Sequence, residues 1–137
     1  MSRGERIRRY RKMKGLTQKS LAEKIGLAES AVRNYELGLR DPSQETLAAL
    51  SEALGVPMSA LDDYELSSAR EALEALFRLE DAFGLKPVDG ETLALDPKAE
   101  GAQKLSAALA AWRGALDELE AGEMTQDEYE RWRATFE

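Results

Sequence analysis

Four glycines divide the first half of the chain into short segments, and they constrain its fold more than any other feature. Gly15, Gly26, Gly38 and Gly55 each follow a segment whose apolar residues recur at helical spacing. Glycine readily takes the left-handed conformation in which many helices end. Such short helices are stable only when they bury an apolar face against neighbours. The first half is therefore predicted to be a cluster of short helices joined by tight turns.

The helices predicted in this half cover residues 4–14, 17–25 and 29–36. A fourth starts at Asp41-Pro42-Ser43 and runs to Leu54, and a short fifth lies around 59–64. Thr17 is expected to be the N-cap of the second helix. The residues predicted to face the core are Ile7, Tyr10, Leu21, Ala22, Ile25, Val32, Tyr35, Leu47, Leu50 and Leu54.

The second half has different signals. The capping-box pattern Ser68-x-x-Glu71 opens a predicted helix that ends at Phe83. Residues 85–95 resemble a small β-hairpin with a two-residue Asp89-Gly90 turn and Pro87 on an edge. Asp96-Pro97 is expected to start a long helix that ends at Gly122.

A last helix follows a staple and capping-box pattern at Met124-Thr125-x-x-Glu128. The fold is therefore predicted to be mainly α. It would have one domain over residues 1–66 and a helical dimerisation or partner-binding region over 67–137, with a possible hairpin at 85–95.

Composition excludes several kinds of chemistry. The 137 residues include no Cys and no His, which excludes disulfides, thiol nucleophiles, Cys/His zinc sites and Ser–His–Asp triads. We therefore expect no enzyme, no metal and no cofactor. No run of about 18 apolar residues and no secretory signal is present, so a cytoplasmic protein with no membrane contact is expected.

The formal charge of −7 is unevenly distributed. Residues 1–40 hold 11 Lys and Arg against four Glu, a net +7, whereas residues 65–137 hold eight Lys and Arg against 17 acidic residues, a net −9. This asymmetry suggests two parts with different partners. The basic first helix, with Arg6, Arg8, Arg9, Arg11 and Lys12, is either a solvated face or attracts phosphates.

The spacing of glycines, apolar residues and capping residues in the first half of the chain resembles that of the Cro/cI phage-repressor type, or XRE family, of helix-turn-helix regulators. The matching residues are Ile7-x-x-Tyr10-Arg11-x-x-Lys14-Gly15-Leu16-Thr17-Gln18, Leu21-Ala22-x-Lys24-Ile25-Gly26, Val32-x-x-Tyr35-Glu36-x-Gly38, Pro42-Ser43-x-x-Thr46-Leu47 and Ala53-Leu54-Gly55-Val56. The resemblance covers residues 4–64 and implies a five-helix lambda-repressor-like domain that binds double-stranded DNA. In such a domain the second helix of the motif lies in the major groove.

The resemblance also implies roles for individual residues. Arg11 and Glu36 correspond to a structural ion pair. The helix N-terminus at Thr17 and Gln18 would meet the DNA backbone, with Lys19 and Arg40 as phosphate contacts. The positions that would face the groove are Glu29, Ser30, Arg33 and Asn34.

Three residues depart from the family pattern. Ala28 stands where the family usually has a Ser or Thr N-cap, a loss of about 1 kcal/mol. Glu29 places a carboxylate near phosphates, although it could accept from cytosine N4. Leu37 replaces a common polar residue. These departures leave the fold intact but affect the target sequence and the affinity.

Apolar residues in the acidic half recur at coiled-coil spacing. Leu105, Leu109, Trp112 and Leu116 form a stripe that suits either a dimer interface or the core of one chain, and Trp132 and Phe136 allow the same two interpretations. About 70 residues with a small hairpin leave little room there for a ligand pocket of several hundred Å³.

Two functions remain open from the sequence. The first is a sequence-specific transcriptional regulator, expected to be a repressor of phage or mobile-element type, that acts as a homodimer on a palindromic operator. The alternative is a protein-interaction module, such as an antitoxin or a phage-encoded inhibitor, whose C-terminal half binds another protein.

Overall fold

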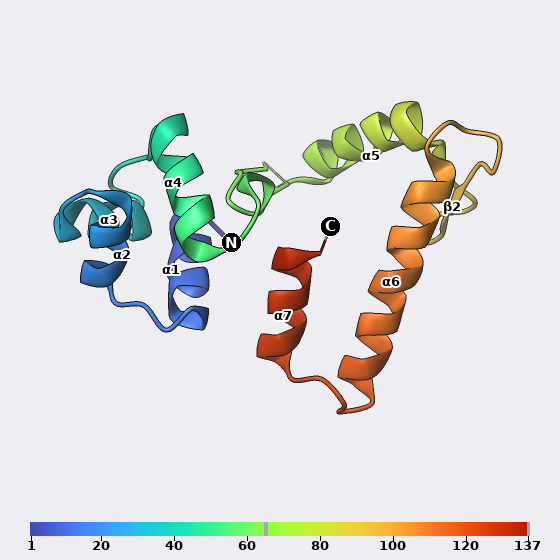
Figure 1. The fold of residues 1–137 in the computed structure, drawn as a ribbon. Coiled ribbons are helices and arrows are strands. Elements are labelled where there is room, and N and C mark those ends of the chain that lie inside the picture. The colour runs from blue at the N-terminus through green and yellow to red at the C-terminus, as the bar shows by residue number, and fades with distance from the viewer. Residues whose placement is uncertain (65, 137) are drawn as a thin grey trace. The chain divides into compact units, whose positions relative to one another are not determined.

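The computed structural model describes residues 1–64 and 66–136, and this part of the chain is mainly helical (Figure 1). The mainly α fold with a small hairpin is as predicted. In chain order the elements are α1 (Arg3–Met13), α2 (Gln18–Ile25), α3 (Glu29–Glu36), α4 (Gln44–Leu54), the 3₁₀ turn η1 (Met58–Ala60), α5 (Ala69–Phe83), β1 (Leu85–Pro87), β2 (Leu93–Leu95), α6 (Ala102–Glu120) and α7 (Gln126–Thr135).

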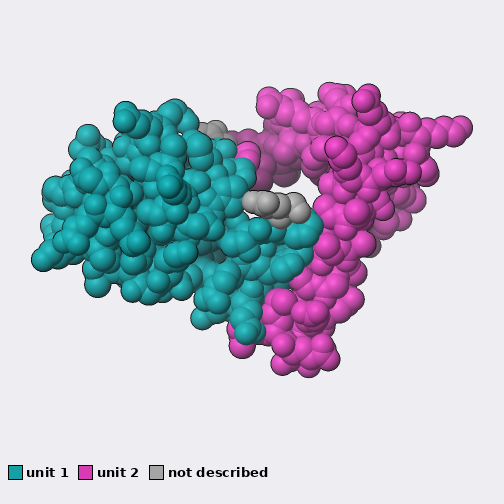
Figure 2. All heavy atoms as spheres, viewed as in Figure 1, with its two compact units in different colours: residues 1–63, 126–137 teal, residues 64–125 magenta. Residues whose placement is uncertain are grey.

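The chain forms two compact units, shown in different colours in Figure 2. Unit 1 combines residues 1–63 with α7, and unit 2 is Tyr64–Thr125. From the sequence, the last helix was expected to group with the acidic region, whereas α7 clusters with the first 63 residues. The contacts responsible join residues far apart in the chain, so no local pattern indicates them.

Capping residues set the ends of the helices in unit 1. Ser2, Thr17 and Ser43 each accept a hydrogen bond from a backbone N–H in the first turn of α1, α2 and α4. Gly26 follows α2 with φ +71°, and Gly55 follows α4 with φ +70°, both in the left-handed region predicted for a glycine stop. The expected fifth helix is shorter than predicted, because only Met58–Ala60 forms a 3₁₀ turn after Pro57.

The core of unit 1 is built from the apolar faces that the helical spacing predicts. Its fully buried side chains come from every helix of the first half and from the segment after η1: Ile7, Leu21, Val32, Leu47, Leu50 and Leu61. Ala134 of α7 belongs to the same cluster. Burial of these apolar groups, at about 1.5–3 kcal/mol for each large side chain, holds the short helices together.

Unit 2 consists of α5, the hairpin and α6. Ser68 and Glu71 form the predicted capping box at the start of α5, and Gly84 ends that helix with φ +70°. The strands β1 and β2 pair antiparallel, with Leu85 opposite Leu95 and Pro87 opposite Leu93.

Two predicted details of unit 2 are wrong. The hairpin loop runs from Val88 to Thr92, because the Val88 N–H donates to the Thr92 carbonyl and the Asp89 carboxylate accepts from two backbone N–H groups within the loop. The long helix starts at Ala102, because the Asp96 carboxylate accepts from the Lys98 N–H in a local turn instead of capping a helix.

Candidate nucleic-acid interface

A tight turn at Gly26 joins α2 to α3. The Leu27 N–H donates to the Ala22 carbonyl at 3.0 Å, which closes the end of α2 and reverses the chain toward Glu29. Helix α3 begins at Glu29 after Ala28, whose side chain makes no capping hydrogen bond, as its lack of a polar atom requires. Because α3 has no side-chain cap, its position relative to α2 depends on the Gly26 turn and on the packing of both helices in the core.

A buried ion pair fixes α3 against α1. The Arg11 guanidinium donates from Nε to Glu36 Oε2 at 2.7 Å and from Nη2 to Oε1 at 2.9 Å, and its Nη1 donates to the Leu16 carbonyl. The hydrogen bond to Glu36 raises the pKa of Arg11 above its ordinary value, although burial acts in the opposite direction. The family-based assignment of this pair agrees with the geometry.

The opposite face of α3 is directed to solvent. Val32 and Tyr35 point into the core, whereas Glu29, Ser30 and Arg33 are exposed and Asn34 is half-buried. Helix geometry places Arg33 and Asn34 about one turn after Glu29 and Ser30. The four predicted groove-facing residues thus lie on a helix whose inner side is rigidly held and whose outer side is accessible.

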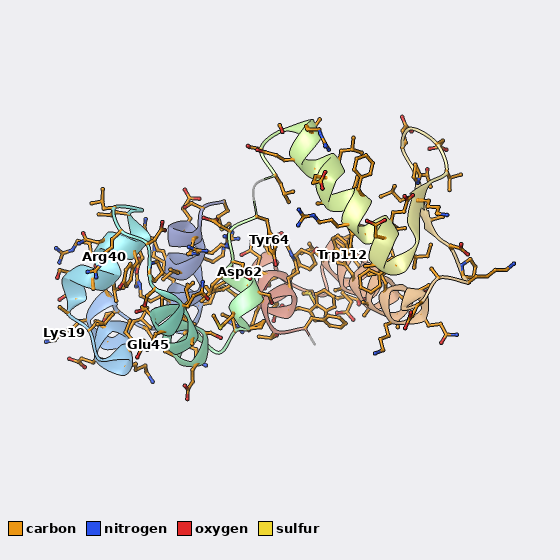
Figure 3. The ribbon with its side chains drawn as sticks, turned by 90° about the horizontal axis from the view of Figure 1, so that it is seen from above. Lys19, Arg40, Glu45, Asp62, Tyr64 and Trp112 are labelled. Atoms are coloured by element: carbon orange, nitrogen blue, oxygen red, sulfur yellow. The ribbon has the colours of Figure 1, made fainter. Side chains whose placement is uncertain are left out.

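The N-terminus of α2 and the segment after α3 carry the remaining predicted contacts. Thr17 Oγ1 accepts from the Ser20 N–H, and Gln18 directs its amide toward Glu36 Oε1 at 3.4 Å. Lys19 is exposed, and the Arg40 guanidinium lies 5.9 Å from the centre of the Tyr35 ring. Figure 3 shows both cations at the outer margin of unit 1 formed by α2 and α3.

Two leucines beside Arg40 are unusually exposed. Leu37 is 64% exposed and Leu39 is 74% exposed, on either side of Gly38. Leu37 stands out in the sequence as a departure from the family pattern, whereas Leu39 was not singled out. Leu39 stands between the turn glycine Gly38 and Arg40, outside any helical repeat, and this position is the sequence signal that predicts an exposed leucine.

The basic first helix is largely neutralised within unit 1. Arg6 pairs with Asp63 at 2.8 Å, and Arg9 pairs with Glu130 of α7 at 2.8 Å. Arg3, at the start of the same helix, lies 3.7 Å from Asp41. The charge of +7 in residues 1–40 is therefore not all available to a ligand, and several of these cations have a structural role.

The predicted dimer residues fall into both units. Leu105, Leu109, Trp112 and Leu116 lie on α6 in unit 2, where Leu109 and Trp112 are exposed and the other two are half-buried. In unit 1, Trp132 of α7 and Phe136, which directly follows that helix, pack with their ring centres 4.9 Å apart. These residues do not form one patch within either unit.

Neither a metal site nor a membrane span is found in the described parts of the chain. Among residues 1–64 and 66–136, no group of three or more His, Cys, Asp or Glu is arranged to hold a metal ion. Within the same residues, no helix has the length and apolar character needed to cross a bilayer.

The fold of residues 1–63 and the Gly26 turn define a helix-turn-helix domain. Residues 7–61 match the helix-turn-helix family, so this segment of the chain is a helix-turn-helix domain. The resemblance to XRE-type regulators drawn from the glycine and apolar spacing is confirmed.

Two curated relatives come from Bacillus subtilis (strain 168). The uncharacterized HTH-type transcriptional regulator YqaE is 44% identical over 43 residues, and the HTH-type transcriptional regulator ImmR is 43% identical over 47 residues. These stretches cover 31% and 34% of this chain. The chain spans 37% of the length of each relative.

Solved structures also resemble the chain. The P22 c2 repressor in complex with synthetic operator 9T is 34% identical, with a TM-score of 0.44, and the match covers 44% of this chain and 92% of that one. A SinR protein/SinI protein complex is 27% identical, with a TM-score of 0.45, and the match covers 82% of this chain and 97% of that one.

Proposed function

We propose that this chain is a sequence-specific DNA-binding transcriptional regulator of the repressor type. The observation that carries the proposal is the orientation of α3. Its inner face is fixed by Val32, Tyr35 and the Arg11–Glu36 pair, while its outer face is accessible. Both curated relatives are named HTH-type transcriptional regulators. Such a regulator would act in the cytoplasm, and no catalytic role is proposed for it.

In the proposed complex, α3 enters the major groove. Arg33 would donate to guanine O6 and N7, Asn34 would pair with adenine, and Ser30 would contact a base edge or the backbone. Glu29 would accept from cytosine N4, which would favour operators with cytosine at that position.

Phosphate contacts would fix the orientation of the domain on the duplex. The backbone N–H groups after Thr17, together with Gln18, form the positive end of α2, which favours a phosphate. Lys19 and Arg40 are exposed cations in the segments that flank the recognition helix. These contacts supply affinity, whereas α3 supplies sequence discrimination.

Selection of binding sites from random double-stranded DNA tests this function. We expect an enriched sequence bound by the unmodified chain. The double variant Arg33→Ala/Asn34→Ala should lose roughly 30- to 20,000-fold in affinity for that sequence, since each of the two bidentate base contacts contributes about 1–3 kcal/mol. The matched control Lys24→Ala changes an exposed cation of α2 outside the proposed interface. No enriched sequence, or unchanged operator affinity in the double variant, would contradict the proposal.

We further propose that the regulator is a homodimer on a palindromic operator, because one helix-turn-helix reads only a half-site. The proposal is supported by the apolar faces of unit 2. Leu73 and Phe77 of α5, and Leu109 and Trp112 of α6, are each more than a third exposed. A second copy would remove these side chains from water. Trp132 of α7 and Phe136 after it belong to unit 1, so the dimer proposal rests on α5 and α6.

Light scattering after size-exclusion chromatography tests the dimer. We expect twice the chain mass at micromolar concentration, and the chain mass for Leu109→Asp. The control Gln103→Asp makes the same change of one negative charge at an exposed polar position of α6 and should remain a dimer. A monomeric unmodified chain would contradict the homodimer.

The same apolar faces also suit the alternative, a protein-interaction module of the antitoxin or inhibitor kind. Unit 2 belongs to the acidic part of the chain, so a basic partner would fit it. A monomeric chain that yields no selected DNA site, together with a co-purified protein released by Leu109→Asp, would favour this alternative.

A further inference from the structure

Helix α7 packs against the helix-turn-helix residues of unit 1 and completes their core. Ala134 is 4% exposed and lies in the same apolar cluster as Ile7 and Leu54. One turn earlier, the Glu130 carboxylate pairs with the Arg9 guanidinium at 2.8 Å. The last helix is therefore held to α1 by both apolar and ionic contacts.

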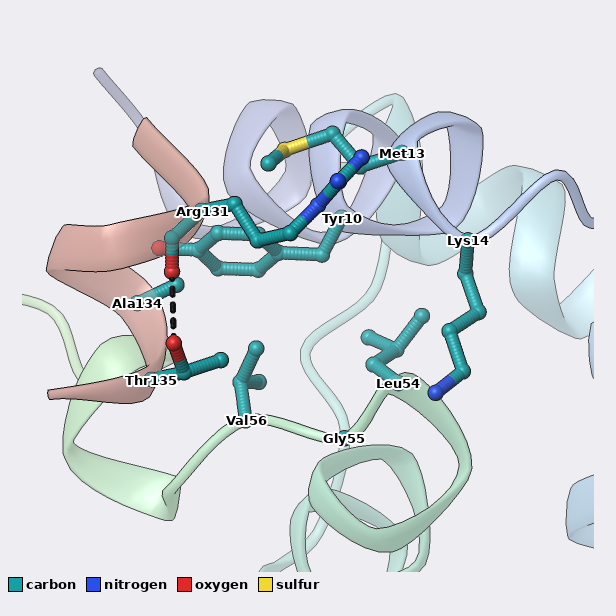
Figure 4. A pocket seen from close by; sticks show the side chains of 9 residues that line it. All are labelled: Tyr10, Met13, Lys14, Leu54, Gly55, Val56, Arg131, Ala134 and Thr135. Atoms are coloured by element: carbon teal, nitrogen blue, oxygen red, sulfur yellow. Dashed lines mark hydrogen bonds between the residues drawn. The ribbon is translucent and has the colours of Figure 1, made fainter. Parts of the chain in front are cut away.

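A cavity remains where the ends of α1 and α4 meet α7. Its volume is about 360 Å³, within the range of roughly 300–1,000 Å³ found for small-molecule sites. Two small residues explain the space. Gly55 ends α4 in the left-handed conformation without a side chain, and Ala134 contributes only a methyl group. Figure 4 shows the lining side chains arranged around this opening.

The cavity combines apolar walls with positive charge. The Tyr10 ring and the buried side chains of Leu54 and Val56 form apolar walls. Lys14 Nζ lies 3.0 Å from the position that a Cβ on Gly55 would occupy, and Arg131 extends from α7 beside Tyr10 (Figure 4). Among residues 1–64 and 66–136, no carboxylate lines the cavity and no ion pair joins either cation to a partner.

Lys14 has one structural explanation that Arg131 lacks. The last carbonyls of α4 form the negative end of that helix, and a cation over Gly55 compensates them. Arg131 lies on α7 and does not compensate the C-terminal carbonyls of α4. Two cations on different elements lie at the margins of one apolar hollow, Lys14 at Gly55 and Arg131 along the Tyr10 ring, and this combination suits a ligand that has an anionic head and an apolar body.

We propose that this cavity binds a small organic carboxylate. Its apolar part would contact Tyr10, Leu54 and Val56, and its carboxylate would pair with Lys14 and Arg131. Inorganic phosphate offers charge without apolar surface, and a neutral alcohol offers apolar surface without charge. Only a ligand with both features uses the whole site. This inference does not depend on DNA binding.

Calorimetric titration of the full chain with sodium hexanoate tests the site. We expect saturable one-to-one binding, with 1-hexanol and inorganic phosphate each bound at least about tenfold more weakly. Methyl NMR signals of Leu54 and Val56 should shift during the hexanoate titration and stay unchanged with phosphate. Absence of saturable binding to the folded chain at millimolar hexanoate would overturn the proposal.

Three variants locate the binding energy. Lys14→Gln and Arg131→Gln should each reduce hexanoate affinity about tenfold, and Thr135→Leu should reduce it by filling the cavity while both charges remain. Lys24→Gln, an exposed cation of α2 away from the cavity, is the matched control and should bind normally. Circular dichroism verifies that each variant is folded. If folded Lys14→Gln and Arg131→Gln bind hexanoate as well as the control does, Lys14 serves only the α4 carbonyls and the proposal is wrong.

Discussion

The Arg11 guanidinium on α1 holds both carboxylate oxygens of Glu36 on α3, at 2.7 and 2.9 Å. The two side chains are 10% and 3% exposed, so water does little to screen their interaction. This pair fixes the proposed recognition helix through residues that do not reach its exposed face. Recognition geometry and stability are thus coupled at one buried contact.

Removal of one partner of this pair should be strongly destabilising. Glu36→Leu leaves the Arg11 charge buried without compensation, and we expect a loss of about 3–5 kcal/mol in the free energy of unfolding. Urea unfolding measures the change. The double variant Arg11→Met/Glu36→Leu removes both charges and should recover most of the loss. An equal loss in the single and double variants would contradict this account.

Gly4 should not tolerate even a methyl group. A Cβ at this position of α1 would lie 2.6 Å from the Glu36 carbonyl oxygen and would also meet the Tyr35 carbonyl oxygen, both backbone atoms that cannot move aside. Gly4→Ala should therefore lower the free energy of unfolding by about 1–3 kcal/mol or more, through displacement of α1 from α3.

Gly114→Ala is the matched control for Gly4→Ala. Gly114 lies within α6, and a methyl group added there would meet no described atom outside its own helix backbone within 4 Å. Alanine has a higher helix propensity than glycine by about 1 kcal/mol, so this change should be neutral or stabilising. Urea unfolding of the two variants side by side separates steric contact from propensity. Equal effects would contradict the close approach of α1 to α3.

Local signals explain why the first half could be predicted from sequence. Thr17 and Gly26 bound α2 through side-chain capping and a left-handed turn, and both features depend on residues within a few positions. The core positions follow from the helical period alone. Arg11 and Glu36 were paired by family resemblance, and no local rule would have joined them.

The parts that were not predicted depend on contacts between distant segments. The start of α6 shifted from Pro97 to Ala102 because Asp96 forms a local turn, while Ala99 packs close to Gly84 at the end of α5. The Arg9–Glu130 contact and the cavity beneath α7 join opposite ends of the chain. Such juxtapositions arise only when the whole of unit 1 is assembled.

Ala28 offers a site at which the domain can be stabilised. Its backbone is extended, with φ −75° and ψ 151°, close to the φ −66° and ψ 167° of the functioning cap Ser43. Ala28→Ser should add a capping hydrogen bond at α3 and raise the free energy of unfolding by about 1 kcal/mol. Thermal unfolding measures the gain, and Ser43→Ala should show a loss of similar size. An unchanged or lowered stability of Ala28→Ser would contradict the expected cap.

Glu71 should titrate below its ordinary pKa of 4.5. The Ser67 hydroxyl, followed by the Ser68 and Ser67 backbone N–H groups, donates to the carboxylate and lowers its pKa. A carboxylate whose pKa is lower in the folded chain than in the unfolded chain stabilises the fold above the unfolded pKa. This contribution is lost as the pH falls through the folded pKa.

An NMR pH titration of the Glu71 carboxyl carbon measures this shift. Ser67→Ala removes the hydroxyl donor and should move the midpoint upward toward the ordinary value. Ser59→Ala, at an exposed serine of η1, is the control and should leave the midpoint unchanged. A midpoint that Ser67→Ala does not move would show that the hydroxyl contributes nothing to the capping of α5.

Arg40 provides a test of the proposed phosphate contacts that is independent of base recognition. Its guanidinium lies beside the Tyr35 ring, 5.9 Å from the ring centre, at the end of α3. Arg40→Ala should weaken binding to all DNA sequences by a similar factor and reduce the slope of log affinity against log salt concentration by about 1. Arg40→Lys should retain the slope, and Lys24→Ala should leave both quantities unchanged. A loss confined to one operator base would instead assign Arg40 to sequence recognition, because a phosphate contact carries no base preference.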